Sequence, residues 1–192
     1  MRIGCVILAA GIARRFGQQK LHAELDGRSL ILRALDAVPE DCPACVVTGD
    51  PAIRAMAIER GMKFVTNSRP EDGISRSVRL GTQALADCGA ICFIPADQPL
   101  LSRQSVEKLL TVSQDNPDRI VRAVHGTVPG NPCIFPRTYF PALMELRGDR
   151  GGSAVMQENP EAILPVELPE RELLDCDTPE ALRKLAEKEA TR

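Results

Sequence analysis

The chain has 192 residues, of which 24 are basic and 26 acidic, and its net charge of −2 offers no positive surface excess for nucleic acid. It has no tryptophan, one tyrosine and five phenylalanines, too few aromatic side chains to stack on the bases of a single strand. Its first apolar segment is too short to cross a membrane and lacks a secretion cleavage pattern. Composition therefore excludes a nucleic-acid or membrane protein and favours a cytosolic one, with residues 1–192 forming a single domain.

The seven cysteines lie mostly in apolar stretches, as reduced thiols in a protein core do. Cys42 and Cys45 have the C-x-x-C spacing of redox pairs, and together with Cys88 and Cys92 they would make a candidate zinc site. Redox pairs of this type sit at a strand-to-helix turn, whereas Cys45 begins an apolar run. We therefore favour a structural role for these thiols and keep a thiol redox protein as an alternative.

The predicted elements of the first half alternate between strands and helices. An apolar run with β-branched residues predicts a buried strand over Ile3–Ala9. Apolar residues at helical spacing predict helices over 29–38, 51–60 and from the Gly73 region to about residue 87, while short apolar runs predict strands over 45–48, 63–66 and 90–95. Such alternation is typical of parallel strands joined by helical crossovers.

The second half continues this pattern less regularly. We expect helices over 102–114 and 137–146 and from residue 179, strands over 120–124 and 133–135, and turns between 126 and 132. The predicted fold is a three-layer α/β/α sandwich around a Rossmann-like, mostly parallel sheet. Ligands of such sheets bind beyond the carboxyl ends of the strands, where the loop after residue 9 begins.

That first loop has the composition of an anion-binding loop. It contains Gly11 and Gly17, where the backbone can approach a ligand closely, and it carries Arg14, Arg15 and Lys20 without any acidic residue. Five residues separate the two glycines and the lysine comes two positions late, so the loop is not a Walker loop, and it also fails the dinucleotide pattern G-x-G-x-x-G. The alternative is a basic surface loop with no ligand.

A second candidate segment follows the third strand. Asn67 precedes a helix start that contains Gly73, Ser75 and Ser77. Hydroxyls and backbone amides at a helix N-terminus suit phosphate or ribose, although an ordinary helix start is the simpler explanation of the segment taken alone.

Three carboxylates form the third candidate group. Asp97 directly follows the buried strand over 90–95, where a charge is costly unless a cation meets it, and a hard divalent cation is the natural partner. Asp175 and Asp177 precede Thr178 and Pro179, a good helix cap and first helical residue. Capping explains Thr178 and Pro179 but leaves the two carboxylates unexplained.

Taken in order, these motifs resemble those of the MobA-like nucleotidyltransferases. The run Leu8-Ala9-Ala10-Gly11, followed by Arg15-Phe16-Gly17 and Lys20, is similar to the family's signature loop; its Ala9-Ala10-Gly11 resembles the cytidylyl branch, because the guanylyl branch usually has L-A-G-G. Gly73-x-Ser75-x-Ser77, Asp97-x-Pro99, Gly148-Asp149-Arg150-Gly151-Gly152 and Asp175-x-Asp177-Thr178-Pro179-Glu180 are also similar to family motifs. Ala13 stands where the family often has serine, and Asn131 where the cytidylyl branch commonly has histidine.

The resemblance implies a nucleotide-diphospho-sugar transferase-like fold and an enzyme that moves CMP from CTP to the phosphate of a molybdopterin-type acceptor, releasing pyrophosphate. It implies Mg²⁺ at Asp97 and Asp177, with Asp175 a weaker candidate, and a molybdenum hydroxylase that uses the product. The implied catalytic residues are Arg15, Lys20 and Asp97, the implied nucleotide contacts are Leu8, Ala9, Ala10, Gly11, Lys20, Asn67, Gly73, Ser75 and Ser77, and the implied acceptor contacts are Asn131, Asp149 and Arg150.

Other functions remain open. The same fold would serve guanylyl transfer from GTP or transfer to a sugar or polyol phosphate, and a non-catalytic accessory protein would bind the cofactor and deliver it to a molybdenum hydroxylase. The chain contains two histidines, His22 and His125. A phosphate nucleophile is already an anion and needs no strong general base, so this scarcity is compatible with nucleotidyl transfer.

Overall fold

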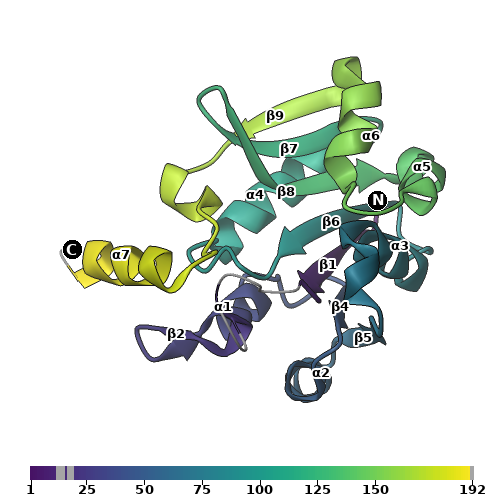
Figure 1. The fold of residues 1–192 in the computed structure, drawn as a ribbon. Helices are drawn as coiled ribbons and strands as arrows, with labels where there is room; N and C mark the ends of the chain where they lie inside the picture. The colour runs from purple at the N-terminus through teal and green to yellow at the C-terminus, as the bar shows by residue number, and fades with distance from the viewer. Residues whose placement is uncertain (12–15, 17–19, 191–192) are drawn as a thin grey trace.

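A computed structural model describes residues 1–11, 16 and 20–190, except the side chains of 188–190, and shows helices on both faces of a seven-stranded sheet (Figure 1). The strand order is β5-β4-β1-β6-β8-β7-β9, and β8 alone in this sheet runs antiparallel to its neighbours. The strands are β1 (Ile3–Ala9), β4 (Ala44–Thr48), β5 (Lys63–Thr66), β6 (Ala90–Pro95), β7 (Ile120–His125), β8 (Val128–Pro136) and β9 (Ile163–Glu167). The short strands β2 (Glu24–Leu25) and β3 (Arg28–Ser29) form a separate hairpin.

The helices divide into two layers. One apolar core joins the sheet to α1 (Leu30–Asp36), α2 (Pro51–Glu59) and α4 (Arg103–Asp115). A second core on the other face contains α3 (Ile74–Ala84), α5 (Phe140–Glu145) and α6 (Gly152–Glu158). The helix α7 (Pro179–Ala190) packs through Leu185 on Leu25 and Leu30. The predicted three-layer, mostly parallel α/β sandwich is confirmed.

The central strand β1 shows why the sheet needs both layers. Cys5 and Ile7 point into the first core and Val6 into the second, and all three are fully buried. Gly81 on α3 permits the close packing, since a Cβ at that position would lie 2.4 Å from Cγ1 of Val6. A strand enclosed in this way has no polar face, which is why its sequence is a continuous apolar run.

The sequence predicts the first half of the chain closely and the second half less well. The predicted bounds of β1, β5 and β6 match those observed, and Ser29 and Ser102 cap α1 and α4. Of the turns predicted over 126–132, the one at 126–127 is confirmed and the rest is wrong, because β8 begins at Val128 and pairs with β7 across an irregular register. Pro129, Gly130 and Pro132 resemble turn residues, but the pairing with β7 overrides that local pattern. The helix α6 and the edge strand β9 were not predicted.

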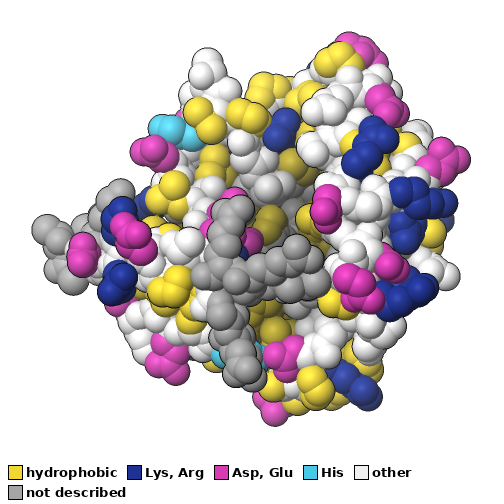
Figure 2. All heavy atoms as spheres, in the orientation of Figure 1, with side chains coloured by type: hydrophobic (Ala, Val, Ile, Leu, Met, Phe, Trp, Pro, Cys, Tyr) yellow, Lys and Arg dark blue, Asp and Glu magenta, His cyan; other side chains and the backbone are white. Residues whose placement is uncertain are grey.

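The cysteines are unpaired in this structure. Cys45 is buried in β4, and burial raises the pKa of its thiol to about 11, which leaves it protonated and unreactive at neutral pH. Within the described residues, no helix is both long and apolar enough to span a bilayer. On the face drawn in Figure 2, basic and acidic side chains are interspersed.

Candidate active site

The candidate site lies where several segments meet at the carboxyl end of the sheet. The loop after β1 leads to the short 3-10 helix η1 (Lys20–His22), and Asp97 follows β6, the strand that pairs with β1. The segment before α7 joins this edge, because the backbone N–H of Cys176 donates to the carbonyl oxygen of Asp97 at 2.8 Å. Residues from the beginning, middle and end of the chain therefore meet there (Figure 1).

Lys20 lies between two of the predicted carboxylates. Its Nζ is 2.8 Å from Oδ2 of Asp97 and 2.8 Å from Oδ1 of Asp177. Burial alone would lower the pKa of Lys20, but its hydrogen bonds to Asp177 and Asp97 outweigh burial and raise that pKa. The ammonium is therefore charged at neutral pH, and the structure brings Lys20, Asp97 and Asp177 into one cluster.

Asp175 lies in the same segment but faces another partner. Its Oδ1 accepts a hydrogen bond of 3.0 Å from Nε2 of Gln98, which also donates to the carbonyl oxygen of Leu173. Burial raises the pKa of Asp175, and the neighbouring charges of Asp97 and Asp177 raise it further. Of the two carboxylates left open by the sequence, Asp177 is therefore the one that contacts Lys20.

A pair that the sequence analysis missed holds the helix η1 in place. His22 Nε2 lies 2.7 Å from Oδ2 of Asp50, and Oδ1 of Asp50 caps α2 by accepting from the N–H of Ala52 at 2.8 Å. Although burial opposes it, the contacts with His22 and Ala52 lower the pKa of Asp50. A single histidine 28 positions from its partner leaves no local sequence signal.

A cavity of about 430 Å³ opens beside Asp97, and we call it the strand-end cavity. It is lined by Leu8, Ala10, Gly11, Pro70, Glu71, Gly73, Ile74, Ser77, Pro95, Asp97 and Asp149. The lining includes predicted nucleotide contacts from both the first loop and the start of α3. Arg15, predicted to be catalytic, and Arg14 lie outside the described residues. A hollow of about 580 Å³ at the opposite, amino ends of β1, β4 and β5 contains none of the predicted site residues.

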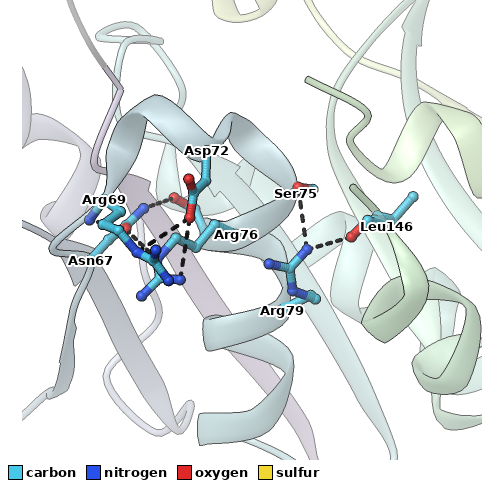
Figure 3. A network of polar contacts seen from close by, with 8 residues as sticks. Asn67, Arg69, Asp72, Ser75, Arg76, Arg79 and Leu146 are labelled. Carbon is cyan, nitrogen blue, oxygen red and sulfur yellow. Dashed lines mark hydrogen bonds and ion pairs between the residues drawn. The ribbon is translucent and has the colours of Figure 1, made fainter. Parts of the chain in front are cut away.

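Asn67 organises the backbone between β5 and α3 (Figure 3). This buried side chain accepts at Oδ1 from Nε of Arg76, at 2.9 Å, and from the N–H of Arg69, and it donates from Nδ2 to Oγ of Ser77 at 3.0 Å. Because Ser77 accepts from Asn67, its own hydroxyl proton is available to donate into the strand-end cavity. Asn67 thus orients a cavity residue without lining the cavity itself.

Ser75 was predicted to contact the nucleotide, but the structure turns it elsewhere. Its backbone N–H donates to the carbonyl oxygen of Gly148 at 3.1 Å, and its buried Oγ accepts from Nη1 of Arg79 at 3.3 Å. Arg79 also donates to the carbonyl oxygen of Leu146 (Figure 3). Ser75 therefore joins α3 to the segment after α5, and it does not line the strand-end cavity.

Gly73 is required by both its backbone conformation and its surroundings. Its φ is +84°, and a Cβ there would lie 2.4 Å from the backbone of Gly148 and 2.6 Å from Oδ1 of Asp149. We expect Gly73→Ala to lower the free energy of unfolding by more than about 1–3 kcal/mol, because strain at positive φ adds to a backbone clash. Urea unfolding measures this effect.

The matched control for that variant is Gly61→Ala. Gly61 has a φ of +67° but open space around it, so this change carries the conformational cost without the clash. Equal losses of unfolding free energy in the two variants would show that the contact between Gly73 and Gly148 is not tight.

A smaller cavity of about 260 Å³ adjoins the strand-end cavity, and we call it the side cavity. The two share Leu8, Ile74, Pro95 and Asp149. The side cavity is also lined by Val78, Phe93, Arg122, Asn131, Cys133, Phe135, Gly151, Gly152, Ser153 and Met156. Its apolar wall includes Phe93 and Phe135, whose rings meet edge to face with centroids 6.0 Å apart.

Of the predicted acceptor contacts, Asn131 and Asp149 line the side cavity. Arg150 does not; it is exposed, and its Nη2 lies 3.3 Å from Oε1 of Glu158. Arg122, on β7, lines the side cavity and was missed by the sequence analysis. The sequence does mark Arg122 as unusual, because it is the one charged residue in the apolar run 120–124.

The donor groups at Lys20 suit a divalent cation that also binds phosphate. No group of three or more His, Cys, Asp or Glu side chains in the described ranges is arranged to hold a metal by itself. Mg²⁺ commonly takes one or two carboxylates and completes its shell with waters and substrate phosphates. Asp97 and Asp177, two carboxylates separated by one ammonium, fit that requirement.

Comparison with known proteins identifies the family. Residues 5–163 match the model of the MobA-like NTP transferase domain. The chain belongs to the MobA-like NTP transferase family. The resemblance inferred from the motifs is therefore confirmed, and the curated homologues of this family member are nucleotidyltransferases.

Two curated relatives were found at low identity. The chain is 32% identical over 114 residues to a molybdenum cofactor guanylyltransferase of Rhodobacter capsulatus, a match that covers 57% of this chain and 58% of that protein. It is 22% identical over 184 residues to the molybdenum cofactor cytidylyltransferase of Escherichia coli K12, covering 88% of this chain and 92% of the relative. The names of the two relatives differ in the nucleotide that is transferred, guanylyl in one and cytidylyl in the other.

Solved structures share the fold. Rv0371c of Mycobacterium tuberculosis H37Rv superposes with a TM-score of 0.84 at 23% identity, covering 97% of this chain and 99% of that one. Its manganese complex gives 0.75 at 22% identity, with the same coverage. A CMP:2-keto-3-deoxy-manno-octonic acid synthetase complexed with CTP gives 0.76 at 15% identity, covering 100% of this chain and 99% of that one.

Proposed function

We propose that this chain transfers a nucleoside monophosphate, CMP from CTP, to the phosphate of a molybdopterin-type acceptor and releases pyrophosphate. The observation that carries the proposal is the cluster of Lys20, Asp97 and Asp177 beside the strand-end cavity. An ammonium and a pair of carboxylates beside a cavity are the groups that triphosphate chemistry requires.

In the proposed reaction, an acceptor phosphate oxygen forms a bond to the α-phosphorus, and the bond from that phosphorus to the bridging oxygen breaks. The electron pair leaves with pyrophosphate. Since the nucleophile is an anion, the chain's task is to hold the phosphates in line and to neutralise their charge. Lys20 supplies a positive charge for the departing pyrophosphate.

Asp97 and Asp177 are the residues that would hold Mg²⁺. When bound, this ion acts as a Lewis acid toward the phosphate oxygens. The donor set supports the assignment, and the related mycobacterial protein was solved with manganese, another divalent cation that binds oxygen ligands. Asp175 interacts with Gln98 and has a positioning role in this proposal.

The preference for CTP rests on the first loop. Ala10 and Gly11 line the strand-end cavity, and Ala9-Ala10-Gly11 is similar to the cytidylyl branch. The Ser77 hydroxyl can donate to cytosine O2 or N3, but the other bases also offer acceptors, so this contact does not select the base. One observation favours GTP instead: the carboxylate of Glu71 also lines the cavity, and it could accept from the two adjacent N–H groups of guanine.

We propose that the side cavity receives the acceptor ring system. Its apolar wall suits a flat heterocycle, and Asn131, Asp149 and Arg122 provide hydrogen-bonding and charged groups around it. The cavity adjoins the strand-end cavity, so an acceptor held there would present its phosphate toward Asp97. A molybdenum hydroxylase is the proposed recipient of the product.

Pyrophosphate release with four nucleotides tests the function. We expect release from CTP in the presence of Mg²⁺ and molybdopterin, and at least tenfold slower release from GTP, ATP and UTP; reactions without acceptor are the control. Faster release from GTP would identify the guanylyl alternative. Tight binding of nucleotide or acceptor without any turnover would reject the enzyme and support the accessory protein.

A further inference from the structure

The ammonium of Lys20 stands where a cation bridging two carboxylates would stand. Its distances to Asp97 and Asp177 are equal at 2.8 Å, and these two residues are 77 and 157 positions away in the sequence. An ion bound by the same two oxygens, Oδ2 of Asp97 and Oδ1 of Asp177, would take the place that Nζ now fills. The ammonium and the ion cannot occupy this position together.

We propose that Lys20 is an internal substitute for the metal, an inference that rests on the proposed function. In the nucleotide-free protein Lys20 pairs with Asp97 and Asp177, and the divalent ion would bind as the triphosphate draws Lys20 away. Metal and nucleotide then bind cooperatively, and the metal alone binds weakly.

The less exposed carboxylate, Asp97, gains most from such a substitute. The Lys20 side chain is 10% exposed and that of Asp97 is 30% exposed, so water screens their charges only in part, whereas the Asp177 side chain is 58% exposed. Asp175 adds a third carboxyl group within the same segment, and mutual repulsion among the acids would disfavour the folded arrangement without a cation. Lys20 supplies that cation before any ligand arrives.

The exchange needs a rotation of the Lys20 side chain and no change of its backbone. The backbone carbonyl of Lys20 accepts from the N–H of Ala23 at 3.1 Å, and the neighbouring His22 is held by Asp50. A lysine carries a compact charge on a flexible four-carbon stem, so its Nζ can exchange partners by rotation alone. The strand-end cavity beside Asp97 is the place where a triphosphate would offer the new partner.

The exchange preserves charge pairing throughout. Before binding, Lys20 pairs with the carboxylates; afterwards Lys20 pairs with phosphate oxygens and the metal pairs with the carboxylates. Thermodynamic linkage requires that the nucleotide raises the affinity for the metal by the same factor as the metal raises the affinity for the nucleotide. Removing the ammonium should therefore strengthen metal binding in the absence of nucleotide and weaken this coupling.

Electron paramagnetic resonance of free Mn²⁺, titrated with nucleotide-free protein, tests the inference. We expect Lys20→Met to bind Mn²⁺ at least tenfold more tightly than the wild-type protein. Lys20→Arg, which keeps a positive charge, should remain weak, and Lys184→Met should match the wild type because Lys184 is exposed on α7 and pairs with Glu180. A non-hydrolysable CTP analogue should tighten Mn²⁺ binding to the wild type more than to Lys20→Met.

Equal Mn²⁺ affinities of the wild type and Lys20→Met, both folded by circular dichroism, would overturn the inference. Lys20→Gln serves as a second uncharged variant if Lys20→Met does not fold, with the same expectation. The result is separable from the proposed function, because the titration needs no turnover. If Lys20→Met binds Mn²⁺ more tightly but the wild type transfers no nucleotide, the proposed reaction is rejected and the inference on Lys20 stands. If the wild type is active but the two proteins bind Mn²⁺ equally, the inference on Lys20 is rejected and the proposed reaction stands.

Discussion

Replacing Asp97 with asparagine is expected to lower kcat by at least two orders of magnitude, which corresponds to about 3 kcal/mol of transition-state stabilisation. Asparagine keeps the size of the side chain but removes the negative charge that faces Lys20 at 2.8 Å. The charge matters because a divalent cation is held by carboxylate oxygens far better than by an amide. Steady-state pyrophosphate release at saturating nucleotide and acceptor measures the loss.

The matched control is Asp118→Asn, at an exposed position in the turn before β7. It should leave kcat within about twofold of the wild type. Wild-type turnover by Asp97→Asn in a folded protein would remove Asp97 from the metal site, and with it the proposed arrangement of the acceptor and α-phosphates.

Replacing Lys20 with alanine is the second change with a large expected effect. We expect kcat/KM for the nucleotide to fall at least 100-fold, about 3 kcal/mol, because alanine removes the ammonium that contacts both Asp97 and Asp177 and that would balance the charge of the departing pyrophosphate. If Lys20 acts mainly on the departing pyrophosphate, most of the loss lies in kcat. A loss confined to KM would instead show that Lys20 contributes equally to ground-state and transition-state binding.

Lys63→Ala is the control for this variant. Lys63 begins β5 at the opposite end of the sheet, where its Nζ lies 3.4 Å from the carbonyl oxygen of Ala84. It should keep the wild-type kcat/KM. A Lys20→Ala protein that folds and turns over at the wild-type rate would contradict the role assigned to the cluster.

The parallel half of the sheet could be predicted from sequence because its signals are local. β1, β4 and β6 are covered on both faces, so each is a nearly continuous apolar run. The order of the strands placed the first loop and Asp97 at the same edge, which the pairing of β1 with β6 confirms.

The remaining half depends on contacts that local patterns do not encode. β9 is an edge strand with a proline at position 165, and β8 contains prolines at 129 and 132, so both lack the usual strand composition. Ser75 and Ser77 are equivalent in the sequence motif, yet only Ser77 lines the strand-end cavity. That difference depends on Arg79 and Gly148, which lie outside the motif.

The choice between Asp175 and Asp177 shows the same limit. The sequence does not distinguish these two carboxylates as metal ligands. In the structure the amide of Gln98 donates a hydrogen bond to Asp175, while Asp177 contacts Lys20. Arg122 could be predicted in part. A charged residue inside an apolar strand indicates a polar contact at that position, but the sequence does not show which cavity the residue lines.

The reversed direction of β8 has a consequence for how such proteins diversify. Because β8 runs against β6 and β7, its first residues and the tight connection that precedes them come to the ligand-binding edge of the sheet, with Val128 open to solvent. An exposed hairpin tip tolerates insertions that the buried parallel strands would not. Under the proposed function, relatives that differ in this hairpin would differ around the acceptor cavity and keep the cluster of Lys20, Asp97 and Asp177.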